Sequence, residues 1–535
     1  MIEVFRYFTR LLNYFILKAK NDNIRDFNHY SNIEKIPSSI KSVRDKLEEI
    51  FSDSADFVLR EIALGENSEV KILIAFIDGL TNKQTVNTNI LRALMIESRI
   101  SKLNREVNRE TIIDILKENL LSIGDLEIID DFKQTVEKIL SGDTVIYIDG
   151  KNVAFKADTK GWETRGVEEP ETEAVVRGPR EGFTETLRTN TALLRRKIRN
   201  PKLKFEMIKL GEQTNTDVCI CYIKGIANPD IIETVKRRLK RIKIDAILES
   251  GYIEEFIEDE PFSLFPTVGN SEKPDVVAAK LLEGRIAILC DGTPFALTVP
   301  YLLIETIQAS EDYYSRPYFA SLARFARMLA FFASVILPSF YVALISFHAD
   351  VIPFKLLLSV SASREGLPTS AFTESLLMVL SFELLREAGV RMPRPIGQAV
   401  SIVGALVLGE AAVKAGLVSN LMIMVTALTA ISSFVVPPMG GTIPILRVAF
   451  LIAANILGFM GLFLSIFVVL IHLCSLRSFG VPYTSPVAPL DGMGLKDSIV
   501  RFPIWSMITR PKDITGNKNK NVEHRMKISH IKKED

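Results

Sequence analysis

The longest uncharged apolar stretch of the chain covers residues 328–347 (MLAFFASVILPSFYVALISF). As a helix, a segment of this length crosses the hydrocarbon core of a bilayer, which is about 30 Å thick. Pro338 is compatible with such a helix, because neighbouring groups in lipid can satisfy the backbone carbonyl that proline leaves free. Three cations, Arg316, Arg324 and Arg327, precede the stretch, so we expect the chain to enter the membrane from the cytoplasmic side.

Three further apolar segments, residues 396–415, 417–436 and 448–476, predict additional spans. Their presence argues against the alternative that 328–347 is a buried helix of a large soluble protein. The first of the three is rich in glycine, alanine and serine, and the last is long enough to cross at a tilt. The stretch 351–385 is irregular and predicts a short or broken segment followed by an amphipathic helix. The number of crossings therefore stays open between about four and six.

Ionisable and polar side chains inside this apolar half are the candidates for function, because they are costly in a membrane. Glu374 and Glu383 admit two interpretations: they lie along an ion path, or they form structural pairs with Arg364 and Arg386. The small-residue segment 396–415 likewise either packs closely against a neighbour or lines a narrow pore. The pore or gating candidates are Gln398, Ser401, Val403, Val407, Glu410, Glu374 and Glu383.

The N-terminal half has a different pattern, in which charges are frequent and apolar runs are short. Residues 71–79 and 217–225 are both strand-like runs that end in a turn pair and are followed by a helical pattern. This repetition predicts two related α/β subdomains, although two such units can also resemble each other by chance. Asn228 and Pro229 predict the start of a helix over 231–242, as the N-cap and the first helical residue.

Two strand pairs are predicted in this half. Alternating residues on both sides of Asp149 and Gly150 predict a hairpin over 143–157. Residues 286–307 are apolar, but the sequence DGTP at 291–294 divides them into arms too short to span a bilayer as a helix. We interpret them as strand, turn and strand; the alternative is an entry element that lies on the membrane surface.

Charge and composition restrict the function further. The 535 residues carry a net charge of +1, which gives no support for nucleic-acid binding. Basic clusters at 195–199 and 236–243 are interpreted as solvated helix faces or, alternatively, as a surface near anionic lipid or an acidic partner. The four cysteines form no disulfide framework or metal spacing. Cys219 and Cys221 alternate along a strand-like run, so we expect reduced core thiols.

These patterns together predict an α/β cytoplasmic domain, with two subdomains, followed by an all-α multi-pass membrane domain. The predicted divisions are a helical lead-in at 1–60, the α/β domain at 61–315, the membrane domain at 316–477 and a basic, partly disordered tail at 478–535. The sequence contains no phosphate-binding loop, no paired metal ligands and no nucleophile–histidine arrangement. We therefore expect neither an enzyme nor a cofactor or metal.

A set of motifs carries a resemblance to a known family. They are RGPREGF at 177–183, KPD at 273–275, DGTPF at 291–295, EDYY at 311–314, LPSFYV at 337–342, SREG at 363–366, LLREAGVR at 384–391, PRPIG at 393–397 and FGVPY at 479–483. With these motifs the chain resembles, from about residue 70 to residue 510, the A subunit of the spore germination receptors, the GerA family. One departure is Lys273, where the family usually has arginine, and lysine cannot replace an arginine that makes a bidentate contact.

The resemblance implies a receptor subunit in the spore inner membrane that responds to small nutrients. It also implies a transporter-like B subunit and a lipoprotein C subunit as partners, and a ring-shaped homo-oligomer that acts as a ligand-gated ion channel. A secondary transporter and a non-conducting scaffold are the alternatives, although the two halves of the membrane part show no repeat of the kind seen in transporters. The structural or coupling candidates are Arg364, Arg386, Glu387, Arg391, Arg180 and Asp291.

Overall fold

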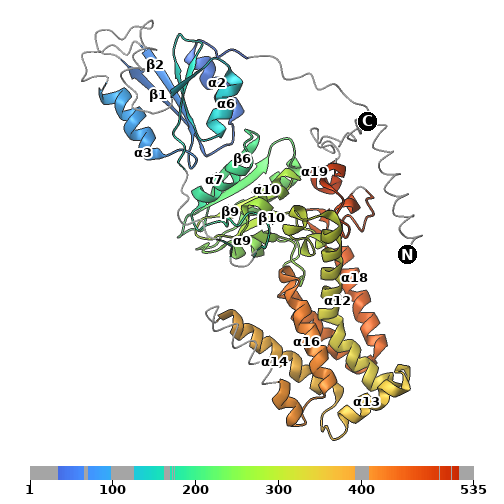
Figure 1. The fold of residues 1–535 in the computed structure, drawn as a ribbon. Helices are drawn as coiled ribbons and strands as arrows, with labels where there is room; N and C mark the ends of the chain where they lie inside the picture. Colours follow the sequence, from blue (N-terminus) through green and yellow to red (C-terminus); the bar gives the residue numbers. More distant parts are fainter. Residues whose placement is uncertain are drawn as a thin grey trace, which may run out of the picture.

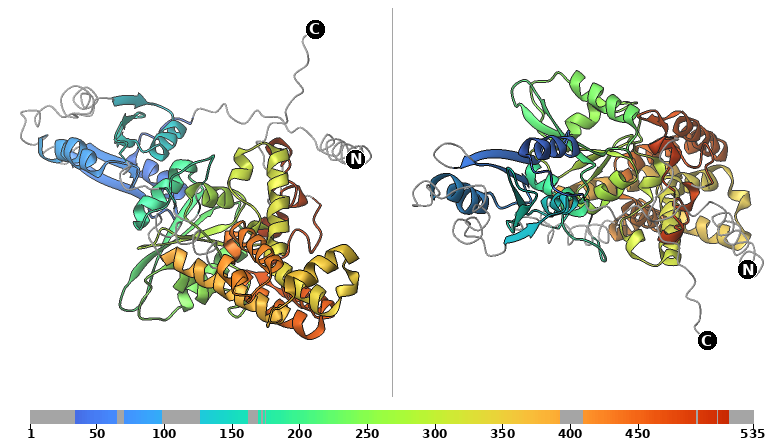
Figure 2. Two further views of the ribbon diagram at one scale, coloured as in Figure 1. Left: turned by 60° about the horizontal axis from the view of Figure 1, so that its bottom comes forward. Right: turned by 90° about the horizontal axis from the view of Figure 1, so that it is seen from above.

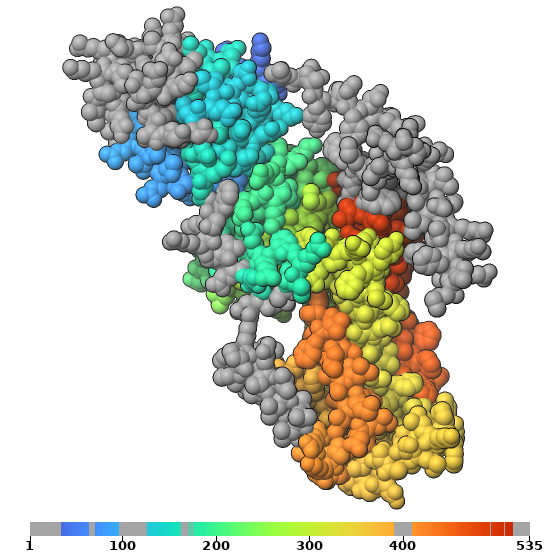
Figure 3. Space-filling view, in the orientation of Figure 1, coloured from blue at the N-terminus to red at the C-terminus, as the bar shows by residue number. Residues whose placement is uncertain are grey.

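The computed structural model describes residues 34–64, 70–97, 126–161, 169–170, 173, 175–391, 409–492, 494–507 and 509–516. Two regions that each contain a β-sheet are followed by a bundle of helices, and the three parts are stacked lengthwise (Figure 1). Figure 3 shows the same order, from the blue and cyan first region through the green second region to the yellow and orange bundle.

The first region is a five-stranded antiparallel sheet with helical segments on both faces. Its elements are α2 (Ile40–Ile50), β1 (Phe57–Leu64), β2 (Val70–Ile77), α3 (Lys83–Thr85), the π-helical segments Val86–Leu91 and Ala93–Glu97, β3 (Leu126–Ile129), α6 (Phe132–Leu140), β4 (Thr144–Ile148) and β5 (Ala154–Ala157). Alternate side chains of β2 point to opposite faces of the sheet. Leu73 and Ala75 pack with α2 and α6, whereas Ile72 and Ile74 pack with the π-helical segments.

The second region has the same layered form. Its elements are α7 (Leu187–Lys197), β6 (Leu203–Leu210), β7 (Thr216–Ile223), α8 (Pro229–Arg241), α9 (Ser250–Ile257), β8 (Gly269–Ser271), α10 (Pro274–Leu282), β9 (Ile286–Cys290), β10 (Ala296–Val299), the 3₁₀ turn Leu303–Thr306 and α11 (Glu311–Tyr314). Helices α8 and α9 cover one face of this sheet, and α7 and α10 cover the other.

The two sheets repeat one strand order. They run β1-β2-β4-β5-β3 and β6-β7-β9-β10-β8, and every neighbouring pair is antiparallel. In each sheet the third strand along the chain lies at the edge, beside the fifth. This repetition supports the predicted relation between two subdomains, because an identical non-sequential order is a stronger similarity than a repeated strand–turn–helix pattern.

Several local predictions are confirmed. β4 pairs with β5, and β9 pairs with β10, each as an antiparallel hairpin. The side chain of Asn228 accepts a hydrogen bond from the backbone amide of Asp230 at 3.1 Å, and Pro229 is the first residue of α8. Cys219 and Cys221 are free, buried and packed in one core cluster. All of these features depend on residues close together in the chain.

The second half of the lead-in predicted at 1–60 contains a helix, as expected, but this helix is part of the first sheet region. Residues 40–50 form α2, whose buried Ile40, Val43 and Leu47 belong to the core of the first sheet. The three-and-four spacing of these residues gives α2 one apolar face, and the sheet provides the surface that covers it. Residues 1–33 lie outside the described part of the chain.

One member of the basic cluster at 195–199 differs from both predicted interpretations, whereas Arg196, Lys197 and Arg199 are at least partly exposed. Arg195 is fully buried and joins the two sheet regions, because its Nε and Nη2 donate to the carboxylate of Asp56 at 2.9 Å each. The same guanidinium donates to the carbonyl of Leu203 at 3.0 Å and lies over the ring of Phe205. A single charge pattern along a helix cannot reveal a partner located 139 residues away in the sequence.

The bundle is organised around α12. Its helices are α12 (Pro317–Phe347), α13 (Phe354–Arg364), α14 (Ala371–Arg391), α16 (Asn420–Phe434), α17 (Thr442–Leu457) and α18 (Phe459–Ser475). α12 contacts α14, α16, α17 and α18, and both views of Figure 2 show the bundle well separated from the first region. Within the described part of the chain, α12 alone is both long and apolar enough to cross a membrane; α16, α17 and α18 are apolar but shorter.

The predicted single long span at 448–476 is wrong. Gly458, at φ +59°, separates α17 from α18, and the two helices pack against each other. A Cβ atom on Gly461 would lie 2.1 Å from the carbonyl oxygen of Ala453, so only glycine allows this close hairpin. Continuous hydrophobicity hid the turn, because glycine does not interrupt an apolar run.

The predicted tail at 478–535 is also wrong for its first part. The chain returns to the second region through β11 (Arg477–Ser478), β12 (Val481–Pro482), the 3₁₀ turns Gly494–Lys496 and Ile504–Ser506, and α19 (Lys512–Thr515). Phe479, Val481 and Ile514 are buried in the core beneath α8 and α9. The lysine-rich residues 517–535 lie outside the described part.

Candidate functional site at the base of α12

The short helix α11 connects the second region to α12, and each of its four side chains contacts a different segment. Glu311 accepts hydrogen bonds from the backbone amides of Val176 and Arg177. The hydroxyl of Tyr314 donates to Asp275 at 2.6 Å. Two motifs that are distant in sequence, RGPREGF and KPD, therefore meet at EDYY.

Asp312 is the buried acid of this site. Its carboxylate accepts hydrogen bonds from Arg324 at 2.9 Å and from Arg327 at 2.8 and 2.9 Å. Burial raises the pKa of Asp312, but the hydrogen bonds from Arg327 and Arg324 lower it more, so its pKa lies below the ordinary value of 3.8. The carboxylate is therefore ionised and fixes the first turns of α12.

Arg324 connects this acid to the C-terminal segment. Its Nη1 donates to the carboxylate and to the carbonyl of Asp497, both at 2.9 Å, and to the carbonyl of Ser498 at 2.8 Å. Tyr313 donates to the other carboxylate oxygen of Asp497 at 2.7 Å. We call Asp312, Tyr313, Arg324, Arg327 and Asp497 the junction cluster. It joins α11, α12 and the returning chain in one network of hydrogen bonds.

The junction cluster includes two of the cations that precede the long apolar stretch. Arg324 and Arg327, two of the three cations that predicted entry from the cytoplasm, are paired with Asp312 and Asp497. Arg316, the third, is exposed. These two arginines therefore have a structural role at the junction, in addition to the position that predicts the side of entry.

Lys273, the departure from the family motif, is fully buried next to the junction. Its Nζ donates to the hydroxyl of Ser310 at 3.2 Å and lies 3.8 Å from Asp275. The RGP loop encloses Tyr314 closely, because a Cβ atom on Gly178 would lie 2.8 Å from the tyrosine ring. In place of the bidentate contact that an arginine could make, Lys273 thus has one hydrogen bond to a hydroxyl and one long ion pair.

Glu374, a predicted pore candidate, is fully buried and paired. It lies 3.2 Å from Arg364 and accepts hydrogen bonds from the backbone amide and hydroxyl of Ser419. Arg364 also donates to the hydroxyl of Tyr341 at 3.2 Å. This group connects α12, α13, α14 and the N-terminus of α16. The Arg364 pairing is the one that the sequence had suggested.

Glu383, the second pore candidate, is also paired. Arg386 lies 3.4 Å from it, as suggested, but Arg447 of α17 is closer at 2.8 Å. The Nε of Arg447 donates at 2.7 Å to the carbonyl of Ser334, which is the carbonyl that Pro338 leaves without its helical partner. The sequence analysis missed Arg447, because the predicted last span began immediately after it.

The remaining candidates are scattered. Glu410 is exposed and pairs with Lys414 at 2.7 Å, while Gln398, Ser401, Val403 and Val407 lie outside the described residues. Arg180 forms an exposed pair with Glu169 at 3.2 Å. Asp291 accepts from the amide of Leu187 at 2.9 Å, at the start of α7. Glu387 is exposed on α14, which ends at Arg391. For all pore and coupling candidates, the functional role stays a prediction.

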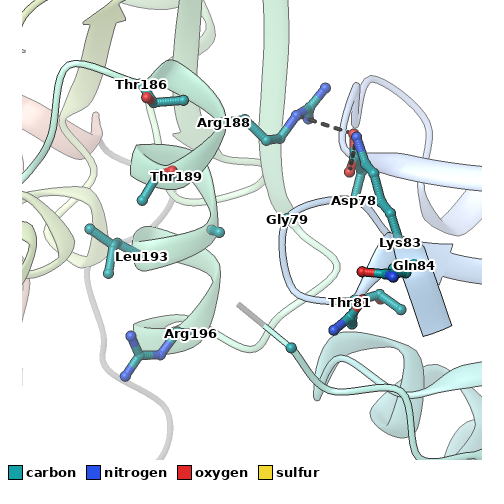
Figure 4. A pocket seen from close by; sticks show the side chains of 13 residues that line it. Asp78, Gly79, Thr81, Lys83, Gln84, Thr186, Arg188, Thr189, Leu193 and Arg196 are labelled. Atoms are coloured by element: carbon teal, nitrogen blue, oxygen red, sulfur yellow. Dashed lines mark ion pairs between the residues drawn. The ribbon is translucent and has the colours of Figure 1, made fainter. Parts of the chain in front are cut away.

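A hollow of about 370 Å³ lies between the two sheet regions. Figure 4 shows Arg188 of α7 directed towards Asp78 of the first region, and Asp78 pairs with Arg188 at 3.3 Å and with Lys83 at 2.9 Å. Arg196, the third cation of the lining, pairs with Glu181 at 3.2 Å, so each of the three cations has a carboxylate partner and two of them share Asp78. In the described ranges, no group of three or more His, Cys, Asp or Glu side chains is arranged to hold a metal ion.

Comparison with known proteins supports the family resemblance carried by the motifs that meet at the junction. The model of the Bacillus/Clostridium GerA spore germination protein family matches residues 45–513. The chain is 45% identical to spore germination protein KA of Bacillus subtilis (strain 168) over 481 residues, covering 90% of this chain and 87% of that protein. It is 39% identical to spore germination protein GerLA of Bacillus cereus over 476 residues, covering 88% and 94%.

A crystal structure of the N-terminal domain of the A subunit of the Bacillus megaterium spore germinant receptor GerK3 is also similar. It aligns with a TM-score of 0.41 and 33% sequence identity, covering 51% of this chain and 98% of that one. The family model spans both sheet regions, the bundle and the returning C-terminal segment. The chain therefore belongs to the GerA family of spore germination proteins.

Proposed function

We propose that this chain is a multi-pass A subunit of a germinant receptor in the spore inner membrane, and that its oligomer forms a nutrient-gated ion channel. One observation carries the membrane part of the proposal: the bundle is apolar outside and charged inside. The outward side chains of α16 and α18 include Met424, Leu428, Ile431, Phe463, Phe467 and Ile471, all more than half exposed. Glu374 and Arg447, in contrast, are fully buried. This distribution suits lipid and not water.

The same arrangement favours a bundle whose first and last helices, α12 and α18, are connected to the second sheet region on one side of the membrane. The N-terminal end of α12 contacts the second sheet region through Arg324 and Asp312, and the segment after α18 does so through Asp497 with Tyr313 and Tyr483 with Leu303. The test is a fractionation of cells that express the chain. Extraction only by detergent supports the proposal, and recovery in the soluble fraction without detergent contradicts it.

For the ion pathway we propose the segment 396–415. Glu374 and Glu383 are both paired with arginines, which favours a structural role for these two acids. We therefore do not assign the ion pathway to them. Purified chain in planar bilayers would give stepwise single-channel currents if it forms a channel, whereas stoichiometric solute uptake would indicate a transporter. Val403→Ala and Val407→Ala should widen the constriction and cause ion leak. Ile431→Ala, on the exposed face of α16, is the matched control and should not leak.

The non-conducting scaffold remains the second candidate. It would be favoured if Val403→Ala, Val407→Ala and Glu410→Gln all left ion release and germination unchanged. We further propose a transporter-like B subunit and a lipoprotein C subunit as partners, because the GerK3 relative is described as the A subunit of a receptor. Co-purification of the three from spore membranes tests this.

A further inference from the structure

We propose that α9 and the loop after it form an interfacial membrane anchor, in which Phe262 inserts between the lipid headgroups. The inference rests on the proposed function only in requiring that the bundle lie in a bilayer. It assigns a membrane contact to the second sheet region, which the bundle itself does not require.

The anchor consists of apolar side chains exposed in one short segment. Tyr252 and Phe256, four residues apart, lie on one side of α9, and Leu248 comes just before the N-cap of this helix. They are 63%, 41% and 51% exposed, and Phe262, in the following loop, is 101% exposed. Single exposed apolar residues are ordinary, but four in one short segment, three of them aromatic, indicate a surface that is covered in the working protein.

The position of the loop identifies the cover as the bilayer. The hydroxyl of Ser263 is hydrogen-bonded to the ring of His472 at 3.0 Å, near the end of α18. The carbonyl of Leu264 accepts from Thr442, the first residue of α17. The loop thus lies beside the start of α17 and the end of α18, where the apolar helices of the bundle meet the second region. α9 lies at the edge of the second region nearest the bundle (Figure 1). Ile445 follows Thr442 by three residues and Ile471 directly precedes His472, and they are 53% and 68% exposed, so the bundle has exposed apolar side chains close to the loop.

The charges around the anchor indicate how it binds. Glu255 and Glu260 are exposed beside the aromatic side chains. Asp259 is paired with Arg238 of α8, so that cation is already used. An acidic border does not attract anionic lipids, whereas aromatic rings favour the boundary between headgroups and acyl chains irrespective of lipid charge. The anchor should therefore depend on hydrophobic insertion, at a depth of about 5–10 Å.

A fluorescence-quenching experiment on the full chain tests the inference. The exposed Cys474 is replaced by serine, while Cys219, Cys221 and Cys290 are buried and stay unlabelled. Single cysteines at Phe262 and, separately, Phe256 carry an environment-sensitive dye, and the protein is reconstituted in phosphatidylcholine vesicles that contain spin-labelled lipids. Phe467→Cys on α18 reports on embedding of the bundle, and Glu48→Cys on α2 is the distant aqueous control.

The expected result is a blue shift and quenching at 262 and 256 that are strongest with spin labels near the headgroup. The dye at 467 should be quenched most by labels deep in the acyl chain, and the dye at 48 by neither. Anionic lipid or salt should leave the quenching at 262 unchanged. Phe262→Asp should slow germination of spores, and Phe262→Trp should preserve the rate.

Three outcomes would overturn the inference. If 467 is quenched while 262 and 256 behave like 48, the bundle is embedded but α9 is in water. If the dye at 262 shifts to the blue without lipid quenching, a protein surface covers it, such as a second copy of this chain. If 467 is not quenched either, the proposed membrane function fails as well.

Discussion

Arg324 and Arg447 are both fully buried arginines on helices of the bundle, but their surroundings differ. Arg324, in the junction cluster, has two carboxylates and two backbone carbonyls as partners. Arg447 has one carboxylate, which it shares with Arg386, and one backbone carbonyl. The junction thus has spare partners for its arginine, whereas the Arg447 site has the minimum. The difference predicts which site tolerates change.

The largest effect is expected for Arg447→Leu. The substitution leaves the carbonyl of Ser334 without a donor and leaves Glu383 with the more distant Arg386, and removing one partner of a buried pair costs about 3–5 kcal/mol. Thermal unfolding of the detergent-solubilised chain would measure the loss. Arg386→Leu is the matched control and should cost clearly less, because Arg447 still holds Glu383. Equal losses would contradict the ranking.

A smaller effect is expected for Asp312→Asn at the junction. The neutral side chain weakens hydrogen bonds from two arginines, each of which is worth about 1.5–3 kcal/mol when charged, but Asp497 still holds Arg324. We expect a total loss of about 2–3 kcal/mol. A loss as large as that of Arg447→Leu would show that the spare partners do not compensate.

The same aspartate should give the junction a pH dependence. Its folded-state pKa lies below the ordinary 3.8, so its contribution to stability is complete above about pH 4 and is lost as the pH falls through the folded-state value. Unfolding of the parent chain should therefore become easier in acid. Asp312→Asn should remove that part of the acid sensitivity, and an unchanged acid profile would count against the pairing.

Glu254 on α9 is the opposite case, a partly buried carboxyl with acidic neighbours. Burial, and then Glu258 and Glu249, raise its pKa from 4.5 to about 7. The folded chain thus binds this proton more tightly than the unfolded chain, and stability is lost as the pH rises from 4.5 to about 7. Glu254→Gln should stabilise the chain at pH 8 by about 1–2 kcal/mol and have little effect at pH 4, after allowance for partial exposure. A gain at both pH values would contradict this cause.

The smallest effect is expected for Arg180→Ala. Its pair with Glu169 is exposed on both sides, and exposed pairs contribute about 0.2–1 kcal/mol. The same unfolding measurement gives the baseline for the other variants. If germination nevertheless slowed strongly without loss of stability, Arg180 would have a coupling role that its contacts do not explain.

The sequence predicted features that depend on neighbouring residues, and it failed where distant segments decide. The β4–β5 and β9–β10 hairpins, the cap at Asn228 and the Arg364–Glu374 pair could all be inferred from local patterns. The junction cluster could not, because Asp497 is 173 residues from Arg324 and no local pattern connects them. Gly458 was missed for another reason: hydropathy averages over a window and cannot see a positive φ angle at one residue.

Pro338 is a weak point in α12, since a helix bends most easily where a backbone hydrogen bond is missing. Arg447 fills that gap from the neighbouring helix at 2.7 Å. As a result, α12 can bend at Pro338 only if the α17–α18 hairpin moves with it or if the hydrogen bond from Arg447 to Ser334 breaks. Loss of Arg447 would therefore free α12 to bend at Pro338 and at the same time leave Glu383 without its nearer partner.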